Sequence, residues 1–201
     1  KKSKSSGAVS YMPLLAVSAG LLIVVVVPGT LAMADSFFNQ ANIAFQKQDY
    51  NQGLELLQKA SSYNPFKVDY HSNLATIYSR AGAMDQALLE ARKAVRMGRY
   101  NPQNYADLAN IQLSLKNHEE VLACAEKALA LAPFQIKWYG TVARSYFIVG
   151  YSEFVDGNRD EARGHLEASV NVPARIEAQM SGVGETERKL WNRAPLMSAG
   201  A

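Results

Sequence analysis

Residues 68–101 read VDYHSNLATIYSRAGAMDQALLEARKAVRMGRYN, and this stretch decides the fold. Its first half carries apolar residues at helical spacing, and its second half does so again after the short turn GAMDQ. A small residue, Ala75, lies in the first half, where it lets two antiparallel helices approach closely. The stretch therefore predicts two amphipathic helices packed against each other.

The same pattern recurs on both sides of this stretch at a constant spacing of 34 residues, here called the repeat step. Small residues in the first helices follow it at Ala41, Ala75, Ala109 and Ala143. In the second helices it joins Ala60, Ala94 and Ala128. A fixed period of this length is typical of solenoids, in which each unit stacks on the next. We assign four units, 34–67, 68–101, 102–135 and 136–173.

The fourth unit is longer than the others. Its first helix continues past Gly150, where a turn is expected, and a better turn begins at Gly157. The insertion of seven residues adds nearly two helical turns, so the second helix returns on almost the same face. We expect one long helix from about Ile136 to Val155. We also expect a capping helix and a tail over residues 174–201, because terminal repeats are usually atypical.

These units resemble the tetratricopeptide repeat. In the third unit the matching residues are Tyr105, Leu108, Ala109, Val121, Ala128 and Pro133. The chain departs from the pattern at three positions: Gln40 replaces a large aliphatic residue, His71 an aromatic one, and Arg99 a proline. The resemblance implies an all-α, right-handed superhelix of about four helix-turn-helix units.

An apolar stretch precedes the repeats. Residues 14–34 read LLAVSAGLLIVVVVPGTLAMA, contain no charge, and follow three lysines. Two interpretations stay open: a transmembrane helix over 12–34 behind a basic cytoplasmic tail over 1–11, or a signal segment cleaved after Ala34. In both, the lysines place the N-terminal side in the cytoplasm and the repeats outside it. The start at Lys1 rather than Met indicates an internal span, which favours a protein anchored in the cell membrane.

No pattern indicates catalysis, a metal site or a cofactor. The histidines His71, His118 and His165 lack metal-ligand spacing, and Gly182-Val183-Gly184 lacks the strand and third glycine of a dinucleotide-binding loop. The 21 basic and 18 acidic residues become equal in number once the three N-terminal lysines are set aside, which argues against nucleic acid. We therefore expect no enzymatic activity in this chain. The single cysteine, Cys124, excludes an internal disulfide.

The resemblance also implies a binding surface. First helices of such repeats line a concave wall, and the positions here that lie outside the helix–helix core are Asn42, Phe45, Thr76, Arg80, Asn110 and Arg144. Asparagine can bond an extended backbone and arginine a carboxylate, so this mixture suits a protein or peptide partner. The lysines of the carboxylate-clamp subfamily are replaced by Phe38, Ser72, Ala106 and Gly140. The alternative is a stack that packs only on its own or a neighbouring domain.

The C-terminal region carries a second, looser resemblance. Residues 160–198, DEARGHLEASVNVPARIEAQMSGVGETERKLWNRAPLMS, look like the region after the repeats in some bacterial O-antigen ligase or polymerase-like membrane proteins. That resemblance implies an extracytoplasmic interaction scaffold that is part of a larger cell-surface glycan assembly protein. No catalytic position of such a parent lies in these residues. The alternative is a secreted adaptor released by cleavage after Ala34.

Overall fold

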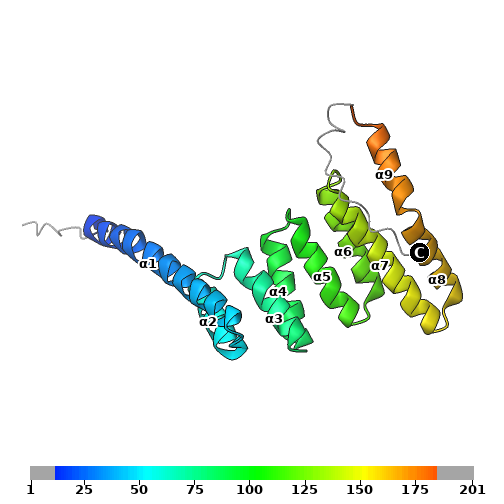
Figure 1. Cartoon of the computed structure of the whole chain (residues 1–201). Helices are drawn as coiled ribbons and strands as arrows, with labels where there is room; N and C mark the ends of the chain where they lie inside the picture. The colour runs from blue at the N-terminus through cyan, green and yellow to red at the C-terminus, as the bar shows by residue number, and fades with distance from the viewer. Residues whose placement is uncertain (1–11, 185–201) are drawn as a thin grey trace, which may run out of the picture. The chain divides into compact units, whose positions relative to one another are not determined.

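The computed structural model describes residues 12–184, with side chains from Gly29 onward. The chain divides into two compact units, residues 1–70 and 71–201, which are described separately below. The expected basic tail over 1–11 and the end of the expected capping region, 185–201, lie outside the described residues. The described part is all-α (Figure 1), with the helices α1 Met12–Gln46, α2 Tyr50–Tyr63, α3 Val68–Arg80, α4 Met84–Met97, α5 Pro102–Ser114, α6 His118–Leu131, α7 Ile136–Val155, α8 Arg159–Val170 and α9 Val172–Ser181.

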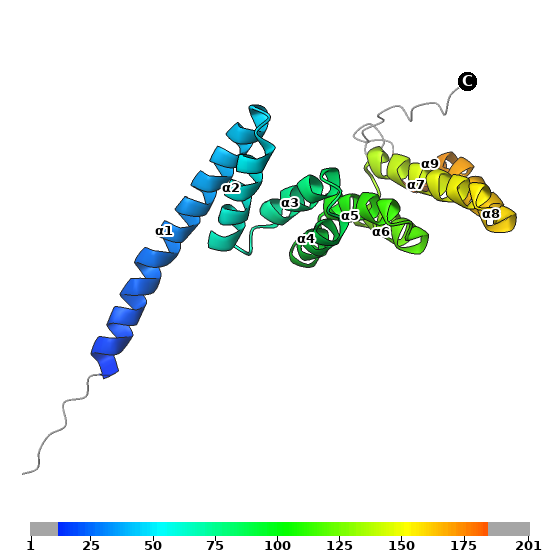
Figure 2. The same cartoon turned by 90° about the horizontal axis from the view of Figure 1, so that it is seen from below.

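In the first unit, α1 and α2 form a helical hairpin, with the two helices side by side (Figure 2). Asp49 caps α2, because its carboxylate accepts a hydrogen bond from the backbone N–H of Gln52 at 3.1 Å. Ala41 and Ala60 are fully buried, as the small-residue pattern predicts. Gly53 also lies between the helices, since a Cβ atom there would overlap the ring of Phe45.

The start of α3 is fixed to α1 within the same unit. Tyr70 is fully buried, its ring lies 5.0 Å from the ring of Phe38, and its hydroxyl donates to Asp35 at 2.6 Å. Lys67 pairs with the same carboxylate at 2.7 Å. The Lys67 ammonium and the Tyr70 hydroxyl hold the pKa of Asp35 below its usual value.

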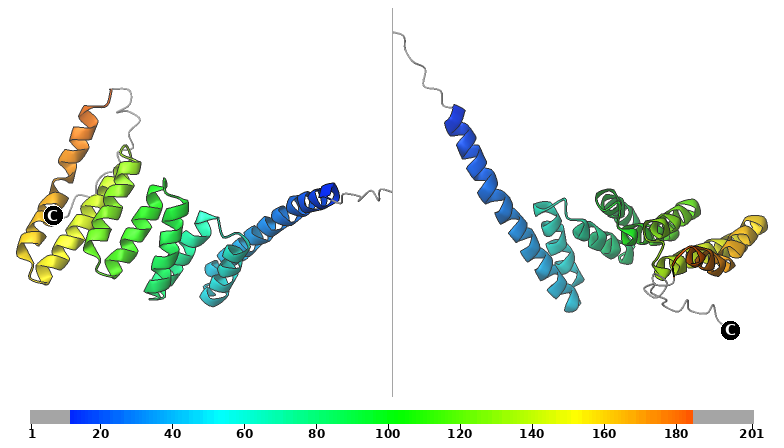
Figure 3. Two further views of the ribbon diagram at one scale, coloured as in Figure 1. Left: turned by 180° about the vertical axis from the view of Figure 1, so that it is seen from behind. Right: turned by 90° about the horizontal axis from the view of Figure 1, so that it is seen from above.

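The expected membrane segment belongs to a continuous helix. α1 is 35 residues long and runs from Met12 into the first repeat without a break (Figure 3). The side chains of residues 12–28 are not among those described. Within the part of the chain that is described, no helix combines the length and the apolar character needed to cross a membrane. The transmembrane helix over 12–34 is therefore not supported by the structure and stays a prediction.

In the second unit the helices pair in sequence order. α5 packs on both α4 and α6, and α7 packs on both α6 and α8 (Figures 1 and 3). One core cluster joins α3 to α6 and contains Ala75, Ala87, Ala91, Leu108, Ala109, Ile111 and Cys124. A second joins α5, α6, α7 and α9 and contains Ala106, Ala125, Ala128, Leu129, Ile136, Trp138, Tyr139, Val142, Val172 and Ile176. This packing confirms the all-α repeat fold.

Each turn between paired helices contains one residue with a positive φ angle. These residues are Gln48, Gly82, Lys116 and Gly157, with φ of 63°, 76°, 57° and 90°. The first three follow the repeat step, and the last comes after one repeat step plus the seven inserted residues. Only glycine adopts this left-handed conformation without strain, so Gln48 and Lys116 hold it at an energetic cost.

The insertion lengthens α7, which remains one continuous helix. This helix has 20 residues, whereas α3 and α5 have 13 each. Gly150 lies inside the helix, where α8 passes closely: a Cβ atom there would be 3.0 Å from the backbone oxygen of Ala162 and 3.0 Å from Cγ of Leu166. The glycine therefore serves helix packing, and the turn is made at Gly157.

α9 begins at Val172, directly after α8, and therefore two residues earlier than the start we expected. Val172 and Ile176 are buried in the cluster that contains Tyr139 of α7. Arg175 makes a bidentate ion pair with Glu126 of α6, with N–O distances of 2.7 and 2.8 Å. α9 thus covers the N-terminal half of α7.

Candidate functional site

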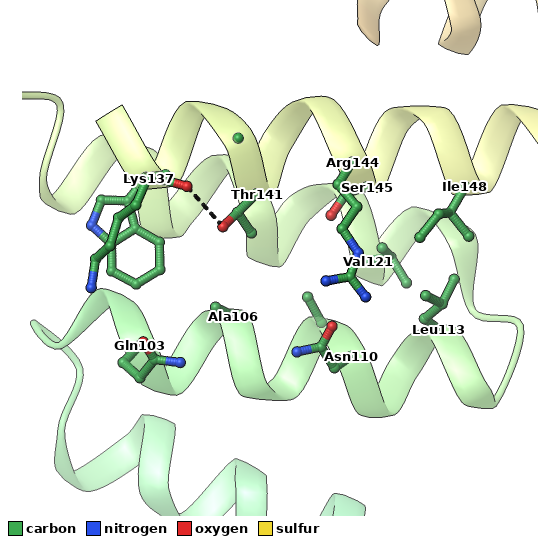
Figure 4. Close-up of a pocket in the computed structure, with 13 residues that line it drawn as sticks. Gln103, Ala106, Asn110, Leu113, Val121, Lys137, Thr141, Arg144, Ser145 and Ile148 are labelled. Atoms are coloured by element: carbon green, nitrogen blue, oxygen red, sulfur yellow. Dashed lines mark hydrogen bonds between the residues drawn. The ribbon is translucent and has the colours of Figure 1, made fainter. Parts of the chain in front are cut away.

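A groove of about 320 Å³ lies between α5 and α7, the first helices of the third and fourth repeat units. In Figure 4 the side chains of α5 and α7 point toward each other across it. The lining side chains come mainly from these two helices and are Gln103, Ala106, Ala109, Asn110, Leu113, Val121, Lys137, Trp138, Gly140, Thr141, Arg144, Ser145 and Ile148.

The repeat itself aligns the two walls. The residues Gln103, Ala106 and Asn110 of α5 lie one repeat step before Lys137, Gly140 and Arg144 of α7. Within each helix the outer two positions are seven residues apart, which places them on one face and about 10 Å apart along the axis. Each wall therefore presents a polar residue at both ends and a small residue between them.

The groove is electropositive. Lys137 and Arg144 supply two cations, and no Asp or Glu occurs among the lining residues. The Lys137 ammonium lies 4.2 Å above the ring of Trp138, and the indole N–H donates to the Gln135 side chain at 3.1 Å. Neither cation has a carboxylate partner in the described part of the chain. The site can therefore attract an anionic group without first breaking an ion pair.

The floor of the groove is formed by residues with small side chains. Ala106 and Gly140 stand where the resemblance places lysines in the carboxylate-clamp subfamily. A Cβ atom at Gly140 would meet nothing within 4 Å, so the space above this residue is open. Small residues here leave room for the backbone of an extended chain between the two cations.

Two of the six predicted binding residues lie in this groove, Asn110 and Arg144. Thr76 and Arg80 are exposed on α3 but do not line it. The Thr76 hydroxyl donates to the backbone oxygen of Ser72 at 3.0 Å.

The other two, Asn42 and Phe45, lie in the first unit and are half-buried. The Phe45 ring packs over Gly53 and lies 6.5 Å from the ring of Tyr50. Phe45 thus contributes to the packing of α1 against α2. Whether any of the six residues binds a partner stays a prediction.

Sequence reasoning missed Gln103, Lys137 and Thr141 as groove residues. The signal was present, because Gln103 and Lys137 each lie seven residues before a predicted position, Asn110 or Arg144. Two helical turns return to the same face, so the period of the helix identifies them.

The other chemically active side chains have structural partners. His71 Nδ1 lies 2.5 Å from Glu90, and Glu153 lies 2.6 Å from His165 and 3.8 Å from His118. Among the described residues, no group of three His, Cys, Asp or Glu side chains could hold a metal ion. Burial raises the pKa of Cys124 to about 11, so its thiol is unreactive near neutral pH.

Stacked helical hairpins that recur at a fixed sequence period define a class, the helical-repeat solenoids. Residues 34–67 and 102–135 match the family model of the tetratricopeptide repeat. The first and third repeat units are therefore similar to the tetratricopeptide repeat.

Curated relatives share the repeat over about half of this chain. A small glutamine-rich tetratricopeptide repeat-containing protein 2 from Mycosarcoma maydis is 27% identical over 103 residues, which are 51% of this chain and 29% of that protein. The Hsp70-Hsp90 organizing protein of Triticum aestivum is 25% identical over 101 residues, 50% of this chain and 17% of that protein. The matched region thus spans less than a third of these relatives. They do not support the looser resemblance to O-antigen ligase-like proteins.

Solved structures show the same fold. MamA superposes with a TM-score of 0.56 at 15% identity, covering 72% of this chain and 81% of that one. The tetratricopeptide-repeat domain of Arabidopsis OM64 gives a TM-score of 0.52 at 20% identity, covering 58% of this chain and 96% of that domain. At these identities the likeness concerns the fold alone.

Proposed function

We propose that this chain is an interaction scaffold that binds an extended, acidic peptide in the groove between α5 and α7. The observation that carries the proposal is the pair of cations, Lys137 and Arg144, in a groove whose lining contains no carboxylate. Arginine binds carboxylates through two parallel hydrogen bonds, and the Asn110 amide can pair with a peptide backbone. The Hsp70-Hsp90 organizing protein among the relatives supports a role in organising other proteins.

The proposal is tested with fluorescein-labelled peptides of alternating Glu and Ser or alternating Lys and Ser. The acidic peptide should bind the full chain, and fluorescence polarisation should show weaker binding as salt rises. The double variant Lys137→Glu, Arg144→Glu should weaken binding by about tenfold or more, because both cations become repulsive. Gly140→Leu should also weaken it by filling the open space.

Lys127→Glu is the matched control, because Lys127 is an exposed lysine of α6 outside the groove. This variant makes a charge change of the same sign at one position and should bind the acidic peptide almost as the parent does. Equal binding of the acidic and basic peptides, or equal losses in the control and groove variants, would refute the proposal.

We further propose that residues 12–34 hold the chain at the cell membrane, with the repeats on the extracytoplasmic side. The charge-free stretch 14–34 behind three lysines supports this, and the continuous α1 would then hold the first repeat close to the membrane surface. The protein should stay in the membrane fraction after alkaline extraction. A mature protein that begins at Asp35 would instead establish the secreted adaptor.

A parent related to O-antigen ligases is the last part of this proposal. It rests on the sequence likeness of residues 160–198 alone. Reading the coding sequence upstream of Lys1 tests it, because such a parent requires further membrane helices there. Their absence would remove the link to glycan assembly but leave the groove proposal intact.

A further inference from the structure

α7, the longest helix of the second compact unit, carries an exposed aromatic stripe. Phe147, Tyr151 and Phe154 follow the i, i+4, i+7 spacing on α7 and are 53%, 58% and 55% exposed. The rings of Phe147 and Tyr151 stack with centroids 6.4 Å apart. These three residues, together with the half-buried Leu166 and the exposed Val170 of α8, are here called the terminal face.

The third repeat unit has positions that correspond to those of the terminal face. Each residue after the seven-residue insertion corresponds to the residue of the third repeat unit that lies one repeat step plus seven residues earlier in the sequence. The counterparts of Leu166 and Val170 are therefore Ala125 and Leu129, which are 0% and 5% exposed in the cluster that contains Tyr139 of α7.

The repeat step also gives the counterpart of one residue of the aromatic stripe. Phe147 lies one repeat step after Leu113, which lines the groove opposite Ile148 of α7. Thus the third unit uses these positions to receive the next helix. In the fourth unit Phe147 is 53% and Val170 is 78% exposed, and Leu166 is half-buried.

A groove lies at one end of the terminal face, where Phe154 and Leu166 line it. It has a volume of about 510 Å³ and is lined by Phe154, Arg159, Ala162, Arg163, Leu166 and Glu167. An exposed apolar surface of this kind marks a contact site, because single exposed apolar residues are ordinary but a contiguous groove is not.

Within the described residues, α9 does not fill this place. Val172 and Ile176 pack against the N-terminal half of α7, near Tyr139, and the ion pair of Arg175 ties α9 to α6. Met180 and Val183 pack against the same cluster. The described chain therefore stops beside the start of α7, whereas the aromatic stripe lies in its C-terminal half.

We propose that the terminal face is covered by residues 185–201 of this same chain, through Leu190 and Trp191. These are the first large apolar residues after Val183. From Ile136 to Phe147 the helix rises about 17 Å, and the seven residues from Gly184 to Trp191 can span about 23 Å. A tethered segment also has a high effective concentration at a nearby surface, which favours it over a free partner.

The two tryptophans of the sequence, Trp138 and Trp191, make a direct test possible. In the full chain with Trp138→Phe, Trp191 is the sole tryptophan. Its quenching by acrylamide should be at least about twofold weaker than in the free peptide 185–201, because burial removes the indole from solvent. Adding Tyr151→Ser and Phe154→Ser should restore the quenching of the free peptide. Tyr100→Ser is the matched control, since Tyr100 is 73% exposed on the chain between α4 and α5 and should leave quenching unchanged.

Two results would overturn the proposal. One is quenching of Trp191 in the Trp138→Phe protein that equals that of the free peptide. The other is protection that disappears on dilution together with a dimer in analytical ultracentrifugation, which would identify a second copy as the occupant.

A second measurement covers the case in which Trp138→Phe does not fold. Leu190→Ser with Trp191→Ser in the otherwise unchanged chain should raise the fluorescence of an apolar-surface dye by about twofold or more, because the terminal face becomes uncovered. Unchanged dye fluorescence would contradict the proposal.

Discussion

The first repeat helix, α1, and the last pair of repeat helices, α7 and α8, differ in the kind of side chain that they expose. On α1, Gln40 occupies the position of Leu74, Leu108 and Val142. Gln40 is exposed and its amide donates to the Ser36 hydroxyl at 3.2 Å, whereas the three aliphatic residues are 3%, 7% and 0% exposed. The last pair instead exposes Phe147, Tyr151 and Phe154.

At the Gln40 position the residue is aliphatic where it is buried, at Leu74, Leu108 and Val142, and polar where it is exposed. In the described part of the chain no repeat precedes the one that contains Gln40, so a polar residue is favourable there. The aromatic stripe on α7 has no such polar substitution, and it is the surface for which a cover is proposed above. The departure of Gln40 from the family pattern is thus a consequence of its place in the stack.

The largest effect should come from exchanging residues across this contrast. Leu108→Gln should lower the free energy of unfolding by about 3 kcal/mol, because it removes buried apolar surface and buries an amide without a partner. Gln40→Leu should change it by less than about 0.5 kcal/mol, as an exposed surface substitution. Urea unfolding monitored by circular dichroism measures both. Equal costs at the two positions would show that Gln40 is covered after all.

Two glycines of α7 should respond in opposite directions. Gly150→Ala should destabilise the fold by about 1–2 kcal/mol, because its Cβ meets the Ala162 backbone and Leu166. Gly140→Ala should stabilise it by up to about 1 kcal/mol, because alanine favours the helix and the space above Gly140 is open. Thermal unfolding of the pair checks this, with Gly164→Ala of α8, also open, as the control for helix propensity. A stabilising Gly150→Ala would mean that α7 and α8 do not approach as described.

The left-handed turn residues give a smaller effect. Lys116→Gly should stabilise the protein by about 0.5–1 kcal/mol, because it removes the strain of a positive φ angle at a residue with a Cβ atom. Gly157→Ala, at the equivalent turn, should destabilise it by a similar amount. Denaturant midpoints compare the two. Destabilisation by Lys116→Gly would exclude the left-handed turn at this position.

The smallest effect is the pH dependence of the stability of the first compact unit, which contains Asp35. Hydrogen bonds from Lys67 and Tyr70 lower the pKa of Asp35, so its stabilising contribution is present above the usual carboxyl pKa and is lost as the pH falls through the lowered one. Burial and the Asp35 carboxylate raise the pKa of Tyr70, so the tyrosine contribution is lost only in strong alkali. Asp35→Asn should therefore destabilise the first unit at pH 6 and have less effect at pH 3. Hydrogen exchange of α1 and α2 measures this, and a pH-independent difference would contradict it.

Several elements could be predicted from the sequence because they follow from periodicity. The repeat step located the buried alanines Ala41, Ala75 and Ala109, and the seven-residue insertion predicted the long helix that ends at Val155. The groove was partly predictable: Asn110 and Arg144 were singled out, while Lys137 and Gln103 required the helical period to be applied to the binding face as well.

Other features could not be predicted, because they depend on which helices meet. The packing of the Phe45 ring over Gly53, the placement of Gly150 against α8, and the ion pair of Arg175 with Glu126 join residues through helix–helix contacts. Local sequence sets the faces of a helix, but the partner of each face depends on how the helices stack.

The sequence by itself thus determined the repeat, its period and the positions of its turns, because these depend on spacing along the chain. Only the tertiary structure decided that α5 and α7 form an electropositive groove without a carboxylate, and that α9 covers one half of α7 and leaves aromatic rings exposed on the other. The physical reason is that charge and apolar surface act through distance in space, and the stacking of successive repeats brings together side chains that are far apart in sequence.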